Sequence, residues 1–396
     1  MVMQLSCHTL IVGGGITGLT IARELLKKGV DDIVIVEKEN SLGAHASGRN
    51  SGVLHAGIYY SPGTYKAKFC VRGNQLIKEY CGDKELTLQH NGKVIVTDDN
   101  RIDSLYELKS RADQSGARSE IIDTQELLEL EPYAVRSEKA LYSPDTAVFN
   151  PNQILLSIKE DLESSGNVRF VLGNSFTGVI GNTTATTNRV SINFINFINA
   201  AGTFADKIAH TFGVGSQYKV LPFKGTYKKL VKSRDFLVRG NIYPVPDLRN
   251  PFLGVHFTRA YDGNVYIGPT AIPAFGREEY GFFDDLSLES LSILGRDVLL
   301  FFVNEGFRTA AKSETKKYFT QYMLSEAKKL VPELKIEDIE DTPKVGIRPQ
   351  LVDWKSKKLV MDFIVLKDGN SLHILNAISP AFTCSMAFAE HVVNDF

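Results

Sequence analysis

Three glycines and a distant glutamate have the types and spacing that point most directly to chemistry. The glycines form the pattern Gly13-x-Gly15-x-x-Gly18, and Glu37 follows about 20 residues later. In such a pattern the first glycine permits a tight turn, the second lets the backbone approach a pyrophosphate, and the third lets a helix pack closely on a strand. The carboxylate suits a ribose with a free 2′-hydroxyl. The pattern therefore predicts a dinucleotide site, for FAD or NAD rather than NADP.

Two apolar strands and one helix must position these residues. The run from Thr9 to Val12 predicts a buried strand, residues 17–28 predict an amphipathic helix, and residues 33–36 predict a second strand that ends at Glu37. This order is that of a βαβ unit, in which the helix N-terminus offers free N–H groups and a positive dipole end to phosphates. A glycine turn that binds no nucleotide is the alternative, and the context disfavours it.

Two histidines and one arginine are further candidates for chemistry. A neutral imidazole accepts a proton near pH 7, which makes His55 the first candidate base and His256 the second. The alternative role for His256 is to donate a hydrogen bond to a substrate carboxylate. Arg348 is the candidate carboxylate ligand, because a guanidinium fork matches carboxylate geometry. Each also has an ordinary structural alternative, as a buried histidine or as part of an internal ion pair.

The composition is ordinary for a globular protein. The chain has 396 residues, a net charge of −1, 43% hydrophobic residues and 23% charged residues, so we expect two domains with sizeable cores and no nucleic-acid partner. Its four cysteines form no CxxC pair, so we expect no metal site and no redox dithiol. No basic region followed by an apolar region is seen at the N-terminus, and no apolar run reaches membrane-spanning length. We therefore expect a cytoplasmic protein.

Several stretches resemble FAD-dependent oxidoreductases of the D-amino-acid oxidase superfamily, and within it the L-2-hydroxyglutarate dehydrogenase/oxidase family. These stretches span nearly the whole chain: SGRNSGVLHAGIYY at 47–60, LPFKGTY at 221–227, GVHFT at 254–258, Gly268-Pro269, GIRPQ at 346–350, and residues 372–387. The resemblance implies a bound FAD that accepts a hydride at flavin N5. It also implies a small L-2-hydroxy acid as substrate, with L-2-hydroxyglutarate oxidised to 2-oxoglutarate as the expected reaction and electrons passed to oxygen or a quinone.

The same resemblance assigns the FAD-binding positions. The loop 47–52 would wrap the diphosphate and the ring, Phe176 would lie in the strand that holds the adenine, and Ala201-Gly202 would approach FAD a second time. N–H groups at the start of the last helix, 379–383, would stabilise the negative N1–C2=O2 locus of reduced flavin. The full predicted set is Gly13, Gly15, Ile16, Thr17, Gly18, Glu37, Lys38, Ser47, Asn50, Ser51, Gly52, Phe176, Ala201, Gly202, Ser379, Pro380, Ala381 and Thr383.

For the substrate, the resemblance implies that Arg348 binds the α-carboxylate while His55 or His256 takes the hydroxyl proton. A diacid needs a second cationic or donor group. The candidates are Lys224, Arg259, Tyr60 and Tyr227, and any one of them is more often a surface or packing residue.

The order of elements predicts an α/β fold, α+β overall. We expect a Rossmann-like FAD-binding domain from residues 1–85, 145–215 and 335–396. A discontinuous antiparallel-sheet substrate domain would come from residues 86–144 and 216–334, with the active site in the cleft between the two. Late helices are predicted over 284–305 and 314–330.

Other functions stay open at this point. The same scaffold oxidises amines or amino acids in some flavoenzymes, and a non-catalytic flavoprotein is a third hypothesis. The apolar run from Val298 to Val303 lies near Lys312, Lys316 and Lys317, which suits peripheral docking on the inner face of a membrane to reach a quinone. The run by itself predicts an ordinary core helix, and membrane docking is the alternative to that prediction.

Overall fold

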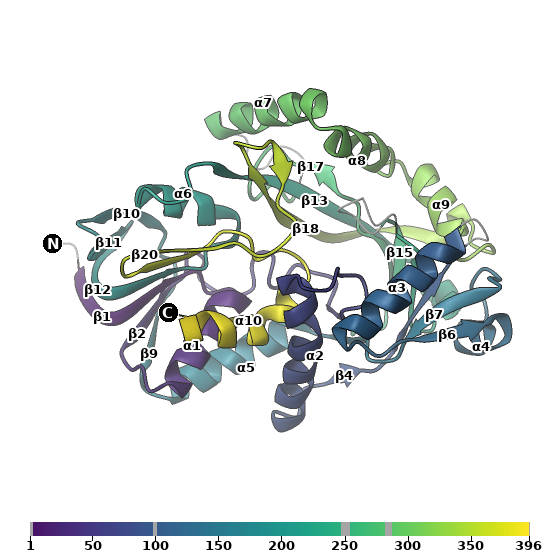
Figure 1. Ribbon diagram of the computed structural model, residues 1–396, viewed down its shortest axis with the longest axis horizontal. Helices are drawn as coiled ribbons and strands as arrows, with labels where there is room; N and C mark the ends of the chain where they lie inside the picture. The colour runs from purple at the N-terminus through teal and green to yellow at the C-terminus, as the bar shows by residue number, and fades with distance from the viewer. Residues whose placement is uncertain (1–2, 98–100, 247–253, 282–286, 396) are drawn as a thin grey trace.

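The computed structural model describes residues 3–97, 101–246, 254–281 and 287–395, and it contains two large sheets (Figure 1). The first sheet has eight strands in the order β10-β11-β12-β1-β2-β9, with β21 beside β12 and β20 beside β21. Strand β1 pairs in parallel with β2 on one side and with β12 on the other, as a doubly wound sheet requires. The strand bounds are β1 (Met3–Val12), β2 (Ile33–Val36), β9 (Val168–Val171), β10 (Phe176–Ile180), β11 (Thr184–Thr187), β12 (Val190–Asn199), β20 (Val365–Asp368) and β21 (Ser371–Ile374).

Helices cover both faces of this sheet. Ile11 packs into a core with helices α1 (Ile16–Lys27), α2 (Tyr65–Asp83), α5 (Pro151–Ser164) and α10 (Ala381–Asp395). Its neighbours Leu10 and Val12 point the other way, into a core that includes helix α6 (Ala205–Thr211). Because both faces are covered, the strands read as continuous apolar runs rather than as alternating ones.

The second sheet has ten strands and is mostly antiparallel. Its order is β19-β18-β13-β16-β15-β14-β5-β7-β6, with β17 beside β13. The long strands β13 and β18 pair in a register that sets Phe223 opposite Arg348. The bounds are β5 (Lys93–Val96), β6 (Glu120–Asp123), β7 (Lys139–Ser143), β13 (Tyr218–Leu230), β14 (Asn241–Pro244), β15 (His256–Arg259), β16 (Val265–Gly268), β17 (Ile272–Pro273), β18 (Ile339–Asp353) and β19 (Lys358–Leu359). A small third sheet joins β3 (Val53–Leu54), β8 (Ala147–Phe149) and β4 (Leu88–Gln89).

Sheet membership bears on the predicted division of the chain. All strands of the eight-stranded sheet fall within the segments predicted to bind FAD. Strands β18 and β19 also fall within the predicted segment 335–396, yet they pair in the ten-stranded sheet. The domain boundaries as such stay a prediction.

The remaining helices differ from prediction in one place. The helix predicted over 314–330 covers only the end of α8 (Glu305–Lys316) and, after a break at 317–319, all of α9 (Thr320–Lys328), so most of α8 was not predicted. The helix predicted over 284–305 is α7 (Leu288–Val303), and residues 284–286 of that prediction lie outside the described residues. Helices α3 (Ile102–Ser115) and α4 (Thr124–Leu130) complete the set.

Helix α7 exposes much of its apolar surface at the edge of the molecule (Figure 1). Leu288 is 89% exposed, Leu291 is 69% exposed and Phe302 is 72% exposed, whereas Leu300 is buried. The prediction of a core helix for 298–303 is therefore wrong for most of that run.

Within the described residues, none of the helices combines the length and the apolar character needed to span a bilayer.

Candidate active site

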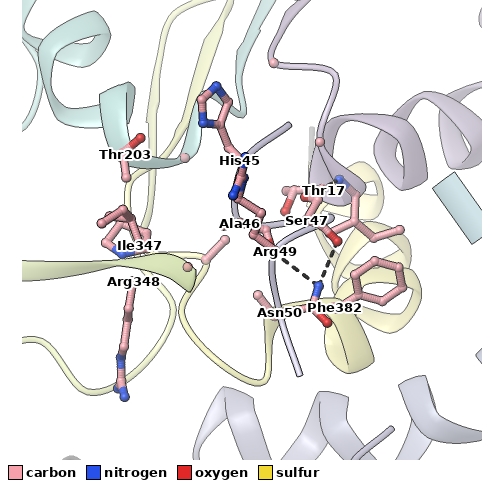
Figure 2. Close-up of a pocket in the computed structure, with 18 of the residues that line it drawn as sticks. Thr17, His45, Ala46, Ser47, Arg49, Asn50, Thr203, Ile347, Arg348 and Phe382 are labelled. Atoms are coloured by element: carbon pink, nitrogen blue, oxygen red, sulfur yellow. Dashed lines mark hydrogen bonds between the residues drawn. The ribbon is translucent and has the colours of Figure 1, made fainter. Parts of the chain in front are cut away.

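A cavity of about 850 Å³ is lined by residues from both large sheets. Its walls come from the turn between β1 and α1, the loop 41–51, strands β13 and β18, and the start of α10. Figure 2 shows part of this lining, with the guanidinium of Arg348 extending away from the end where Thr203 and His45 lie.

The glycine turn lies at one end of the cavity, and its backbone is tightly packed. Gly13 has φ +115° and donates its N–H to the Val36 carbonyl at 2.8 Å. A Cβ on Gly18 would lie 2.0 Å from the carbonyl oxygen of Gly13, so only glycine lets α1 pack this closely. Gly13, Gly15, Ile16 and Thr17 line the cavity, whereas Gly18 does not and acts through packing.

Glu37 lies at the end of β2 and lines the same part of the cavity. Its Oε2 accepts from the Gly14 N–H at 2.9 Å, and its Oε1 accepts from the Glu39 N–H at 3.0 Å. Each carboxylate oxygen can accept a second hydrogen bond. The carboxylate is thus held in place and still able to accept from a ribose hydroxyl.

The loop 47–52 is braced by its own polar side chains. Ser47 Oγ accepts from the Ile16 N–H at 3.0 Å, which ties the loop to the start of α1. Asn50 Nδ2 donates to the Ser47 and Ala46 carbonyls at 2.7 and 3.2 Å, shown as dashed lines in Figure 2. Ser47, Asn50 and Ser51 line the cavity, whereas Gly52 does not.

The other predicted FAD-binding residues also gather here. Phe176, Ala201 and Gly202 line the cavity near the glycine turn. The start of α10 contributes the rest, namely Ser379, Pro380, Ala381 and Thr383. The free N–H groups of a helix N-terminus suit the negative side of a flavin ring. A glycine turn, a strand-end carboxylate and two helix N-termini on one cavity fit a bound FAD.

Lys38 lines the cavity but is already engaged. Its ammonium contacts Glu39, Glu278 at 2.5 Å and the Nε2 atom of His45 at 2.7 Å. Glu39, His45 and Glu278 offer ligand atoms within 4.8 Å of one another, the spacing of a metal site. The lysine ammonium occupies the position that a metal ion would need, so this cluster carries no metal prediction.

His55 is held at the backbone from several directions. Its N–H donates to Thr383 Oγ1 at 3.1 Å, and its carbonyl accepts from Asn74 Nδ2 at 3.0 Å. The side chain lines the cavity, and among the described residues no hydrogen-bond partner reaches Nδ1. Burial, followed by the nearby Lys93 and His256, holds the pKa of His55 well below its usual value. The imidazole is therefore neutral at physiological pH and able to accept a proton.

His256 has a defined tautomer. Its Nδ1 lies 2.9 Å from the Gly254 carbonyl, so Nδ1 carries the proton and donates, and Nε2 is left as an acceptor. The ring stacks on Tyr243 with centroids 3.8 Å apart. Burial lowers the pKa of His256 to about 3. This neutral form cannot donate to a substrate carboxylate through Nε2, which disfavours that predicted role and leaves the role of a base.

Arg348 lies in the middle of β18 and lines the cavity. Burial lowers its pKa to about 10, so the guanidinium stays charged at neutral pH. Tyr227 lines the cavity too, whereas Tyr60 is half-buried and does not. Arg348 thus lies on the cavity as a charged group, where the sequence predicted a ligand for the substrate carboxylate.

The two predicted second cations are used elsewhere. Lys224 Nζ donates to Glu279 at 2.8 Å and to the Gly281 carbonyl at 2.6 Å. Arg259 donates to backbone carbonyls, including that of Val238 at 2.6 and 2.9 Å. Neither residue lines the cavity, so the geometry does not support either as a substrate ligand.

Sequence reasoning missed three residues at this cavity or directly behind it. Arg49 and Tyr280 line it, with the guanidinium carbon 4.3 Å from the ring centroid. Lys93 lies behind it, in an apolar strand where a lysine is out of place. The lysine within an apolar strand was a signal that the sequence contained. The contact between Arg49 and Tyr280 depends on the tertiary fold and has no local signal.

Comparison with known proteins defines the class. The model of the family described as "FAD dependent oxidoreductase" matches residues 8–394, and the chain belongs to this family. Among solved structures, L-alpha-glycerophosphate oxidase of Mycoplasma pneumoniae with FAD bound has a TM-score of 0.77 at 22% identity, covering 98% of this chain and 94% of that one. Glycine oxidase of Geobacillus kaustophilus has a TM-score of 0.72 at 17% identity, with 99% of this chain and 94% of that chain covered. The predicted α/β fold and the predicted cofactor FAD are confirmed.

Curated relatives narrow the class. The chain is 36% identical to the mitochondrial L-2-hydroxyglutarate dehydrogenase of Caenorhabditis elegans, over 97% of this chain and 92% of the relative. It is 34% identical to the human protein of that name, with 98% and 88% covered. It is 31% identical to the L-2-hydroxyglutarate dehydrogenase of Escherichia coli strain K12, with 97% and 92% covered. The predicted resemblance is thereby confirmed, and the chain is an FAD-dependent hydroxy-acid dehydrogenase.

Proposed function

We propose that this protein oxidises L-2-hydroxyglutarate to 2-oxoglutarate. The observation that carries the proposal is the joint placement of one half-buried arginine and two neutral histidines on a cavity that fits FAD. The names of the curated relatives support the choice of this diacid among hydroxy acids.

In the proposed reaction, Arg348 binds the α-carboxylate through its planar fork and so fixes the orientation of the substrate. His55 accepts the hydroxyl proton through its neutral imidazole ring, which lines the cavity. Bound FAD supplies the acceptor for the hydride that leaves the α-carbon. The bonds from His55 to Thr383 and Asn74 keep the backbone of the base in place.

His256 is the alternative base, because its Nε2 is an acceptor on the same cavity. Oxidation of an amine or amino acid is the alternative reaction, since a neutral amine needs no strong base. The two alternatives differ in what they predict for the histidines. A hydroxy-acid oxidase needs one of them, whereas an amine oxidase tolerates the loss of both.

The test is steady-state turnover with a dye acceptor and chemical identification of the product. Wild-type protein and the variants His55→Asn and His256→Asn are compared on L-2-hydroxyglutarate, D-2-hydroxyglutarate, L-lactate and sarcosine. Formation of 2-oxoglutarate from the L-diacid alone, with a large loss of kcat in His55→Asn, is the expected result. Turnover of sarcosine by all three proteins would refute the hydroxy-acid reaction.

We further propose that the electron acceptor is a quinone, reached by docking helix α7 on the surface of an anionic membrane. Four apolar residues follow one face of α7, namely Leu288, Leu291, Val298 and Phe302, and all are at least half exposed. The exposed Lys312 of the adjacent α8 lies 5.8 Å from the ring of Phe301. An apolar face with a lysine beside it is the pattern of a helix that lies in an anionic membrane interface. Lys317, which the sequence also placed near this run, is buried and paired with Glu314, so it does not contribute. We include in this proposal a cytoplasmic location at the inner face of the membrane.

Vesicle flotation tests the docking surface. The double variant Leu291→Glu with Phe302→Glu is expected to abolish binding to vesicles that contain anionic lipid, and to slow reduction of vesicle-borne quinone without changing dye-coupled turnover. Leu156→Glu is the control, because Leu156 is 54% exposed on α5, outside the α7 surface. Equal flotation of the double variant and wild type would refute the proposal, as would wild-type protein that stays unbound and reduces oxygen at full rate.

A further inference from the structure

Lys93 is a buried lysine that the proposed reaction has not used. It begins strand β5 and is 1% exposed. Among the described residues no hydrogen-bond partner reaches its amine, and no described carboxylate forms an ion pair with it. Instead, Nζ lies 4.9 Å from the ring centroid of Tyr59 and 4.5 Å from that of Tyr243. A buried amine that has no hydrogen-bond partner among the described residues is costly, which calls for a functional reason.

Both aromatic rings connect Lys93 to the histidines of the active site. Tyr243 stacks directly on His256, with centroids 3.8 Å apart and an interplanar angle of 21°. Tyr59 belongs to the same segment as His55 and follows it by one short turn of chain. Lys93 thus lies close enough to both candidate bases for its charge to lower the pKa of each, and the ring of Tyr243 contacts both Lys93 and His256.

We propose that Lys93 is a positioning residue for the oxidation, whose buried ammonium keeps His55 and His256 neutral while a dicarboxylate substrate occupies the cavity. This inference rests on the proposed function. Two negative charges entering a buried cavity raise the proton affinity of nearby imidazoles, and a protonated imidazole cannot accept the hydroxyl proton. A cation near the histidines offsets that effect without occupying space in the cavity.

Arg348 from β18 lines the same cavity, but in the proposed reaction its charge is paired with the α-carboxylate, so the second negative charge of the substrate is left to Lys93. The groups that face His256 are Tyr243 from β14, His55, Lys93 from β5 and, more distantly, Lys317. Lys317 is paired with Glu314, so its charge is largely neutralised. Burial lowers the pKa of Lys93 to about 7, and the arrival of a dianion favours its charged form. Binding of the substrate therefore favours the charged form of Lys93.

The test is the pH profile of kcat for Lys93→Met, which removes the charge and keeps an unbranched side chain. Loss of the cation raises the pKa of the catalytic histidine in the substrate complex. The acidic limb of the profile is therefore expected to move to higher pH, by on the order of one pH unit for a unit charge at this range and an effective dielectric constant of about 20. Lys93→Arg keeps the charge and is expected to leave the limb in place. Lys328→Met, on the exposed surface of α9, is the matched control.

Each result separates the possibilities. A shifted limb in Lys93→Met with full recovery at high pH supports the inference. A uniform loss of kcat at every pH, or an equal shift in Lys93→Arg, overturns it and makes Lys93 a structural residue. Wild-type protein that fails to turn over L-2-hydroxyglutarate overturns the proposed function, and this inference with it. If Lys93→Met does not fold, Lys93→Gln is measured in the same way and judged by the same shift.

Discussion

Replacing Arg348 with methionine removes the cation that the proposed function assigns to the α-carboxylate while keeping an unbranched apolar stem. Arg348 lines the cavity from the centre of β18, and burial strengthens any contact it makes. Two charge-assisted hydrogen bonds at about 1.5 kcal/mol each amount to about 3 kcal/mol. At about 1.4 kcal/mol per tenfold, kcat/KM is expected to fall on the order of 100-fold.

The assay is steady-state turnover of L-2-hydroxyglutarate, with the flavin-to-protein absorbance ratio measured on the same samples. Arg348→Lys, which offers a point charge without the fork, is expected to fall between wild type and Arg348→Met. Arg118→Met is the matched control, because Arg118 is exposed and its ion pair among the described residues is with the exposed Glu120. A kcat/KM within threefold of wild type in Arg348→Met, at full flavin content, would refute the assignment of Arg348 to the carboxylate.

Three further predictions follow from the packing, the buried charges and the candidate base. Gly18→Ala would place a Cβ 2.0 Å from the Gly13 carbonyl oxygen, so we expect about 1–3 kcal/mol of lost stability and protein purified with little flavin, read from the melting temperature and the visible spectrum. Arg277→Met leaves the 1%-exposed Asp206 without its ion pair and is expected to cost about 3–5 kcal/mol in denaturant unfolding. Because the pKa of Asp206 is lowered below 3.8 in the fold, its contribution is present above that pH and lost below it, so wild type and variant should converge in stability on acidification. His55→Asn is expected to lower kcat by about 10²–10⁴-fold with flavin content unchanged, and an unchanged kcat would remove His55 as the base.

The nucleotide half of the site could be predicted because its signals are local. The glycine turn, α1 and Glu37 lie within one βαβ unit, where each residue is tied to its neighbours in sequence by backbone geometry. The cavity also collects most of the predicted FAD-binding residues, including those at the start of α10.

The substrate half was harder, because its contacts join residues far apart in the chain. Lys224 was a reasonable second cation, but its partner Glu279 is 55 residues away, and no local pattern reveals that pair. The break between α8 and α9 was missed for a different reason, since residues 317–319 contain neither proline nor glycine to signal a helix end. Lys93 carried a signal that could have been used, because a lysine within an apolar strand is uncommon unless it has a task.

The exposed face of α7 also shows where pattern alone is ambiguous. An apolar run in a helix predicts burial, and burial against the protein or against a membrane looks the same in sequence. Only the exposure of Leu288, Leu291 and Phe302 distinguishes the two.

The central claim is that this flavoprotein oxidises L-2-hydroxyglutarate, and the most direct measurement is anaerobic reduction of its flavin. Purified yellow protein is mixed without oxygen with L-2-hydroxyglutarate, and separately with D-2-hydroxyglutarate, L-lactate, glycerol 3-phosphate and sarcosine, while the visible flavin absorbance is followed. The account predicts rapid bleaching by the L-diacid alone. Bleaching by sarcosine instead, or no bleaching by the L-diacid at full flavin content, would contradict it.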